Sequence, residues 1–151
     1  MAVDVVDGTG TSGTDWSPAR VFLAASAIYH LALGVAGLVI NQTFPLGPDA
    51  TERAASGHVF GIFETNGWHS SAALLLGIVS LYFAIRPRGA RTAAMLIGVQ
   101  HVAIVIAFFA WPPETFWFAS NLADQFVHSF TAIAGIGSAL LTSREQAISP
   151  S

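Results

Sequence analysis

Long apolar stretches without charged side chains alternate with short polar stretches along the chain. Four of these stretches, at residues 21–40, 67–85, 92–111 and 122–142, hold 19 to 21 residues each, and Asp124 is the one charged residue within them. A helix needs about 20 apolar residues to cross the ~30 Å hydrocarbon core of a bilayer. Because backbone groups in lipid must be paired within their own segment, each stretch is expected to be helical. The pattern predicts an all-α protein, a four-helix transmembrane bundle.

The segments outside the four spans are polar. Residues 1–18 are rich in Gly, Thr, Ser and Asp and lack the basic start of a secretory signal, so we expect a disordered N-terminal tail. A single membrane domain is expected at residues 19–143, followed by a C-terminal tail at 144–151. The loop at 41–66 is expected to hold a short helix opened by Asp49 as N-cap.

The composition excludes several classes of protein. Hydrophobic residues make up 53% of the chain and charged residues 10%, whereas a soluble domain carries about 25% charged residues. A nucleic-acid-binding protein would present a basic face, so we expect a lipid bilayer as the surroundings and no nucleic-acid partner. The chain has no cysteine, which excludes disulfides and thiolate metal sites. No catalytic triad order or phosphate-binding loop occurs at a useful spacing, which argues against an independent enzyme.

The arginines predict how the bundle is oriented. All six basic residues are arginines. With four spans, Arg53 lies on one side of the membrane and the other five lie on the opposite side: Arg20, Arg86, Arg88, Arg91 and Arg144. Cytoplasmic loops carry the excess of basic residues, so both termini are expected in the cytoplasm. We therefore expect a multi-pass protein of the plasma membrane.

One histidine lies in each predicted span: His30, His69, His101 and His128. A fifth, His58, lies in the loop between the first two spans. Ionisable residues within a membrane are rare and usually face the interior of the bundle. Small residues three, four, seven or eight positions away share the face of each intramembrane histidine, and small residues let membrane helices approach closely. We expect the four side chains to converge on the axis of the bundle.

Counting along the helices predicts two levels of histidines. The rise of ~1.5 Å per residue, counted from the nearest cytoplasmic arginine, places His30 and His101 about 15 Å deep. The same count places His69 and His128 about 25 Å from the cytoplasmic side. The two pairs are therefore expected to lie roughly 10 Å apart along the bundle.

Two different sites are predicted, one at His30 and His101 and the other in the outer cluster, which is formed by residues around His69 and His128. His30 and His101 could serve as the two axial ligands of a single b-type haem, with Gly34 and Gly98 beside them leaving room for the macrocycle. The outer cluster could instead hold a divalent metal, because imidazole and carboxylate groups suit zinc, iron or copper(II). Its ligands would be His69, Asp124, His128 and Glu64.

Other roles for the histidines remain open. Neutral imidazoles could simply bond to hydroxyl, amide or carbonyl groups across the bundle, or they could handle protons or a quinone. Three functions follow: a cofactor-binding or accessory subunit of a membrane redox or respiratory complex, a structural subunit without a cofactor, and a proton or small-solute pathway. The first two predict a larger membrane complex, or a homo-oligomer, as the setting.

A resemblance to a known family rests on two motifs. The first is the step formed by Gly61, Phe63, Asn66 and His69, followed by the run 74–77, and the second is Tyr29-His30-Leu31 in the first span. These motifs resemble a family of small four-helix membrane proteins, common in actinobacteria and catalogued as a domain of unknown function. More loosely, the architecture is similar to DoxX-type membrane proteins, which implies a link to redox or respiratory chemistry. The resemblance covers about residues 17–143 and implies a fold and a topology.

Overall fold

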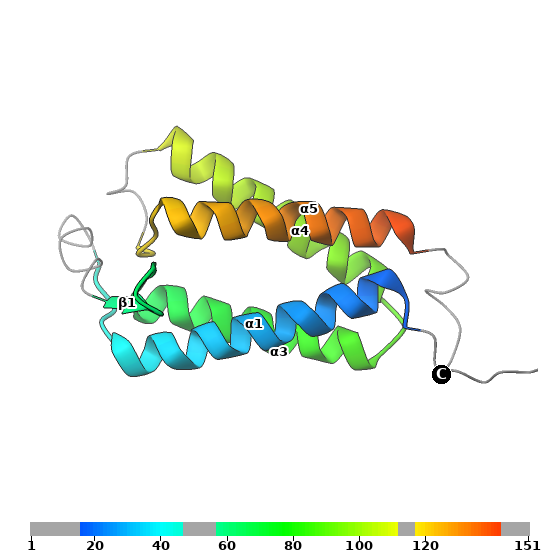
Figure 1. Ribbon diagram of the computed structural model, residues 1–151, viewed down its shortest axis with the longest axis horizontal. Helices are drawn as coiled ribbons and strands as arrows, with labels where there is room; N and C mark the ends of the chain where they lie inside the picture. Colours follow the sequence, from blue (N-terminus) through cyan, green and yellow to red (C-terminus); the bar gives the residue numbers. More distant parts are fainter. Residues whose placement is uncertain (1–15, 47–56, 112–116, 143–151) are drawn as a thin grey trace, which may run out of the picture.

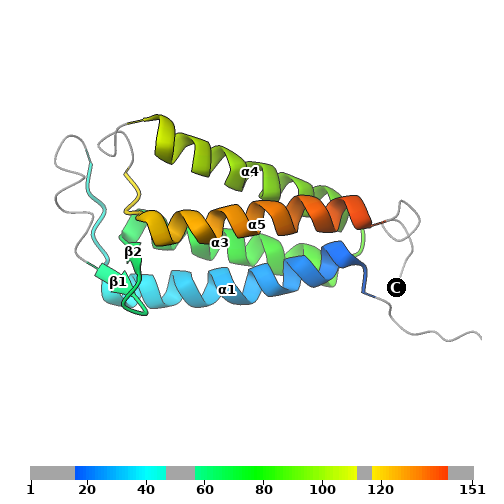
Figure 2. The same ribbon diagram turned by 45° about the horizontal axis from the view of Figure 1, so that its top comes forward.

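Four α-helices form a bundle, and a short β-hairpin closes one end of it (Figures 1 and 2). The computed structural model describes residues 16–46, 57–111 and 117–142. The elements in these ranges are α1 (Pro18–Ile40), β1 (Gly57–Val59), β2 (Phe63–Thr65), α3 (Gly67–Ile85), α4 (Ala90–Ala110) and α5 (Leu122–Leu141). The predicted all-α four-helix bundle is confirmed, and each helix begins and ends within three residues of a predicted span. The short helix expected at Asp49, residues 1–15 of the expected N-terminal tail and the C-terminal tail lie outside the described residues. Pro18, the last residue of the expected N-terminal tail, begins α1.

Polar caps set where the helices begin. Ser17 accepts a hydrogen bond from the backbone of α1 just before a proline that suits the first helical position. Asn66 caps α3 in the same way. Asn121 and Asp124 form a reciprocal capping box at the start of α5, in which each side chain accepts from the backbone N–H of the other residue. Each cap satisfies N–H groups that the first helical turn leaves unpaired.

The helices pack as two close pairs, α1 with α3 and α4 with α5. Gly34 of α1 lies against the backbone of Leu74, and a Cβ atom added to it would come within 2.7 Å of that residue's nitrogen. Gly98 of α4 lies in the same way against Ile136 of α5, at 2.8 Å. These glycines therefore let helices of a pair touch, as small residues do in membranes. The prediction that Gly34 and Gly98 leave room for a macrocycle is therefore wrong.

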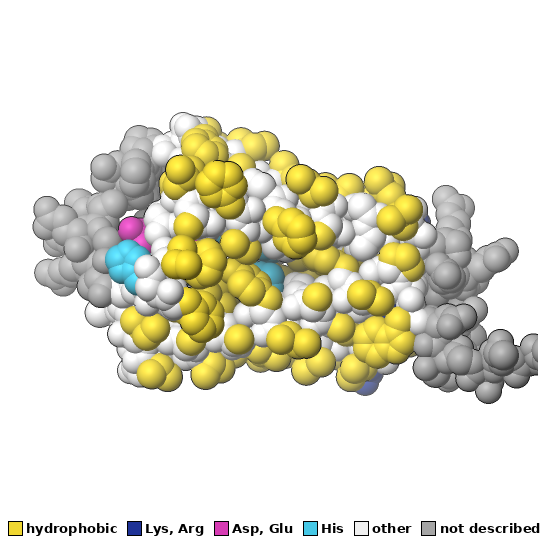
Figure 3. Space-filling view, viewed as in Figure 1, with side chains coloured by type: hydrophobic (Ala, Val, Ile, Leu, Met, Phe, Trp, Pro, Cys, Tyr) yellow, Lys and Arg dark blue, Asp and Glu magenta, His cyan; other side chains and the backbone are white. Residues whose placement is uncertain are grey.

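The outer surface of the bundle is apolar (Figure 3). Three helices, α1, α3 and α4, are long and apolar enough to cross a membrane. The fourth, α5, is equally long but carries Asp124 and Gln125 in its first turn, and both side chains are buried inside the bundle. Its outward face presents Phe126, Phe130 and Ile133, each more than 70% exposed. The polar residues of α5 thus face inward, and its outer face suits lipid as well as the other three do.

The described arginines gather at the end of the bundle away from the hairpin. There α1 and α4 begin and α3 ends (Figure 1). Arg20 donates from Nε to the backbone oxygen of Ala84 at 2.9 Å, and Arg91 donates from Nε to that of Ala139 at 3.0 Å. Both bonds satisfy carbonyl groups near helix C-termini, where the last turn leaves acceptors unpaired. Four of the six arginines thus share one end, and the cytoplasmic location of that end stays a prediction.

Candidate functional site

The four intramembrane histidines come together in one continuous row. The ring centroids of His30 and His101 are 5.7 Å apart, those of His101 and His128 are 5.2 Å apart, and those of His128 and His69 are 6.3 Å apart. Each ring comes from a different helix. The structure therefore brings the four histidines to the interior of the bundle, as the small residues on their helix faces predicted.

The two predicted levels are wrong. The shortest distance in the row joins His101 to His128, two residues that were expected to lie roughly 10 Å apart in height. The count along the chain assumed upright helices, but α4 runs obliquely across the bundle and diverges from its neighbours at the hairpin end (Figures 1 and 2). The histidines form one site.

Backbone carbonyl groups fix the protonation pattern of three of the rings. Nδ1 of each ring lies within hydrogen-bond distance of a carbonyl oxygen: His30 to Ser26 at 2.8 Å, His101 to Ile97 at 2.8 Å and His69 to Ala119 at 2.7 Å. A carbonyl oxygen can only accept, so Nδ1 of each ring carries the hydrogen. In a neutral imidazole the other ring nitrogen, Nε2, then holds a lone pair, and in these three rings it has no hydrogen-bond partner among the described residues.

A cavity of about 450 Å³ lies among the helices, and all four histidines line it. Most of its remaining wall is apolar and comes from α3 and α4, with Tyr29, Gln100, Ser120, Asp124 and Gln125 as further polar groups. On the face drawn in Figure 3, a histidine side chain is visible in a hollow of the apolar surface. Cavities of a few hundred Å³ with an apolar wall and a few convergent polar groups are typical of small-molecule sites.

Two polar atoms of α5 stay unpaired at this cavity. Nδ1 of His128 and Oε1 of Gln125 are buried and make no hydrogen bond within the described chain. The amide group of Gln125 is otherwise held, because its Nε2 donates to the Ser120 hydroxyl at 2.7 Å. Buried polar atoms are nearly always paired in folded proteins, so unpaired ones concentrate where a ligand or water completes the site.

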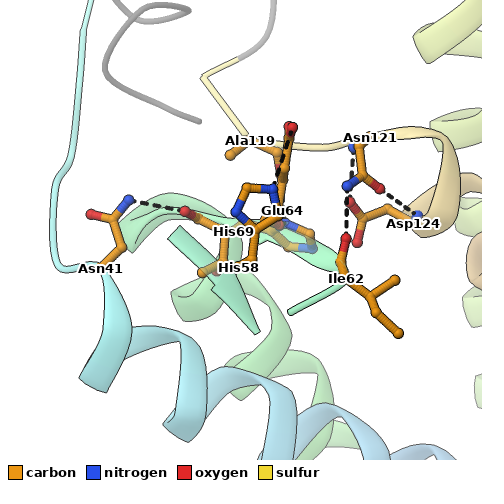
Figure 4. A network of polar contacts seen from close by, with 9 residues as sticks. Asn41, His58, Ile62, Glu64, His69, Ala119, Asn121 and Asp124 are labelled. Atoms are coloured by element: carbon orange, nitrogen blue, oxygen red, sulfur yellow. Dashed lines mark hydrogen bonds and ion pairs between the residues drawn. The ribbon is translucent and has the colours of Figure 1, made fainter. Parts of the chain in front are cut away.

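The residues predicted as metal ligands do not form one cluster. Within the described chain, no group of three or more His, Asp or Glu side chains is arranged to hold a metal ion. The Asp124 carboxylate accepts from the backbone of Asn121 at 2.8 Å, and Glu64 lies 4.0 Å from Nε2 of His58 on the hairpin (Figure 4). His69 and His128 lie ring to ring, with 6.3 Å between the centroids, and the Asp124 carboxyl group lies at the backbone of Glu64.

The predicted haem pair is in direct contact. His30 and His101 meet edge to face, with an angle of 66° between the ring planes. Two axial imidazoles bind opposite faces of one macrocycle, so haem ligation by this pair requires the rings to move apart. The fixed Nδ1–H groups suit coordination by Nε2, because metal-bound histidines usually donate their other N–H to a carbonyl or carboxylate group.

Comparison with known proteins identifies the family but assigns no activity. The model of a domain of unknown function, DUF4383, matches residues 14–141. The chain belongs to the DUF4383 family. No curated protein and no solved structure shows a significant match to the chain. The looser likeness to DoxX-type proteins therefore stays a prediction.

The motif that suggested this family builds the mouth of the site in this DUF4383 protein. Gly61 has a φ of +71° in the turn of the hairpin, a conformation that favours glycine. Asn66 is fully buried, accepts from the backbone N–H of His69 at 2.9 Å and donates from Nδ2 to the carbonyl group of Trp117 at 2.6 Å. The motif thus joins α3 to the segment before α5 and holds His69 in place.

We expect an Asn66→Ala substitution to destabilise the protein more than the matched change Asn121→Ala. Both residues cap a helix, and loss of a cap costs about 1 kcal/mol. Both residues also donate from Nδ2 to a distant carbonyl group, Asn66 to Trp117 and Asn121 to Ile62. Asn66 is fully buried whereas the bond of Asn121 is exposed to water, so the loss of the Trp117 bond is expected to cost more, about 1–3 kcal/mol. Thermal unfolding of both variants in detergent, followed by circular dichroism, measures the difference. Equal stability of the two variants would show that the buried bond to Trp117 contributes no more than the exposed bond to Ile62.

Sequence reasoning missed three residues that line the cavity, namely Tyr29, Gln100 and Gln125. Tyr29 lies edge-on to the His30 ring, with 4.9 Å between the ring centroids. A signal existed for the two glutamines, because Gln100 precedes His101 and Gln125 lies three positions before His128, on the same helical face. Both amides had been interpreted only as bonding partners for the histidines.

Proposed function

We propose that this DUF4383 protein binds a small lipid-soluble molecule, a cofactor or substrate of the surrounding membrane, in the histidine-lined cavity. One observation carries the proposal: a single cavity of about 450 Å³ is lined by five side chains that each carry a nitrogen or oxygen atom without a partner in the described chain, namely His30, His69, His101, His128 and Gln125. A purely structural role for the histidines would pair both ring nitrogens with protein groups. An accessory, cofactor-binding role in a membrane redox complex is the specific form of this proposal.

The path of polar groups does not favour a proton channel. Beyond His30, toward the arginine end, the polar side chains Ser26 and Ser80 are hydrogen-bonded to each other at 3.2 Å. The hydrophobic core cluster, made of residues such as Ala19, Leu23 and Ala94, then fills that end of the bundle. Asp124 therefore lines the same cavity as the row of histidines, whereas apolar packing fills the bundle toward the arginine end. This geometry supports a binding site better than a transmembrane pathway.

The proposal is tested by recovering the bound molecule. The protein is purified from its native membranes in mild detergent, extracted with organic solvent, and the extract is analysed by mass spectrometry. We expect one molecule in near-stoichiometric amount from the wild type and from His58→Phe, whose side chain lies outside the cavity. His101→Phe keeps the size of the side chain but removes both nitrogens, and we expect it to lose the molecule.

A visible spectrum of the same samples separates the haem form of the proposal from the others. A Soret band that disappears in His101→Phe and in His30→Phe would identify haem as the bound molecule. Circular dichroism verifies that each variant is folded. Extracts without any enriched molecule, or the same molecule in wild type and in a folded His101→Phe variant, would overturn the proposed function.

A further inference from the structure

Four of the side chains that line the cavity carry an acceptor atom without a partner in the described chain. His30, His69 and His101 offer Nε2 lone pairs, because their N–H groups are already bonded to carbonyl oxygens. Gln125 offers an unpaired Oε1, and one of its two amide N–H groups is bonded to Ser120. A ligand made only of carbonyl or ether acceptors would leave these atoms unpaired at a cost for each of them. The site therefore favours a ligand that carries hydrogen-bond donors.

The path to the cavity favours a neutral molecule. A groove of about 610 Å³ runs between α3 and α4, and its wall consists of apolar residues together with Gly89, Thr92 and Gln100. The groove and the cavity share Ala72, Leu76 and Gln100, so the two spaces lie next to each other. Moving a cation from water through such a region costs several kcal/mol, whereas a hydroxyl group carries no charge. The donors are thus expected to be hydroxyl groups.

Aromatic side chains give the cavity a shape that suits a planar ring. Tyr29, Phe108 and Phe118 lie on its wall along with the four imidazoles. Aromatic faces and edges pack well against another ring, at centroid distances of about 4.5–7 Å. The head group is therefore expected to be a hydroxylated aromatic ring.

Resting on the proposed function, we infer that the site binds a phenol or hydroquinone whose ring hydroxyl groups donate to the histidine row, and whose apolar tail lies in the groove between α3 and α4. The shared wall at Ala72, Leu76 and Gln100 places the joint between ring and tail where the cavity meets the groove. Gln100 is exposed at this joint and can donate to or accept from a ring substituent.

The inference is tested with three probes of equal tail length. A decyl-substituted hydroquinone has the donors, its dimethyl ether has the same ring without donors, and decylbenzene has no polar head. Saturable binding to the full-length protein in lipid nanodiscs is measured without oxygen, and empty nanodiscs provide the partition baseline. We expect the hydroquinone to bind about tenfold or more tightly than the ether, and decylbenzene to show no saturable binding.

A variant that removes one acceptor sharpens the test. Gln125→Leu is close in size to the wild-type residue and deletes the unpaired Oε1. It also deletes the Nε2 that donates to Ser120, a single bond worth about 1 kcal/mol, so circular dichroism verifies that the variant is folded. It should weaken hydroquinone binding about fivefold or more and leave ether binding unchanged. His58→Phe should change neither.

The outcomes separate this inference from the proposed function. Equal affinity for the hydroquinone and its ether, or an equal effect of Gln125→Leu on both, overturns the inference about the ligand. Recovery of a molecule without ring hydroxyl groups from the native protein also overturns it, yet leaves the proposed binding function standing. If no probe binds and no molecule is recovered by extraction, both fail.

Discussion

We expect an Ala72→Trp variant to lose most of its binding of a lipid-soluble ligand. Ala72 lies on α3 at the place where the cavity and the groove meet, and its side chain is exposed. An indole at this position fills the opening from the outside, so the ligand must displace it or bind without its tail in place. Steric overlap of this kind costs about 1–3 kcal/mol, which corresponds to about a 5- to 150-fold loss of affinity.

The control for this variant is Leu81→Trp, which places the same side chain on an exposed position of α3 away from the cavity and the groove. Both substitutions leave the hydrogen-bonding atoms of the histidine row unchanged. Binding of the decyl hydroquinone in nanodiscs, or the amount of native molecule extracted per protein, gives the result. If Ala72→Trp retains the ligand as well as Leu81→Trp does, the ligand does not pass or occupy the space between α3 and α4.

The helices could be predicted from sequence because their ends are marked locally. The α3 helix begins after the Asn66 cap and ends before Arg86, so the predicted and observed bounds coincide. The α1 helix begins earlier than predicted because Ser17 caps it outside the apolar run. The hairpin had no such signal, since β1 and β2 have three residues each and are too short to show an alternating pattern.

The convergence of the histidines was predictable, but their bonding was only partly so. His30 and His101 donate to the carbonyl group four residues earlier on their own helix, a local pattern that sequence spacing allows. His69 donates to Ala119, fifty positions away, and no local rule identifies that partner. The single row replaces the two predicted levels because the tilt of α4 depends on how whole helices pack, which residue counting does not capture.

We expect a Gly98→Val variant to destabilise the bundle and also to disturb the site. Gly98 of α4 faces Gly135 of α5, and a Cβ atom added to Gly98 would lie 2.8 Å from the backbone nitrogen of Ile136. Backbone atoms cannot rotate away, so the two helices must separate, at a cost of about 1–3 kcal/mol in the free energy of unfolding. His101 lies one turn from Gly98 on the same face, and separation would lengthen its 5.2 Å contact with His128.

Gly137→Val supplies a matched control, because Gly137 lies on α5 and a Cβ atom there would meet nothing within 4 Å. Both variants place the same β-branched residue inside a helix, so their difference isolates the contact between α4 and α5. Unfolding in detergent measures stability, and extraction of the bound molecule measures the site. Gly98 has no side chain that could bond to a ligand. A variant that loses both stability and binding would therefore show that the close approach of α4 and α5 keeps His101 and His128 at one cavity. A Gly98→Val protein as stable as Gly137→Val would contradict the packing described for this pair of helices.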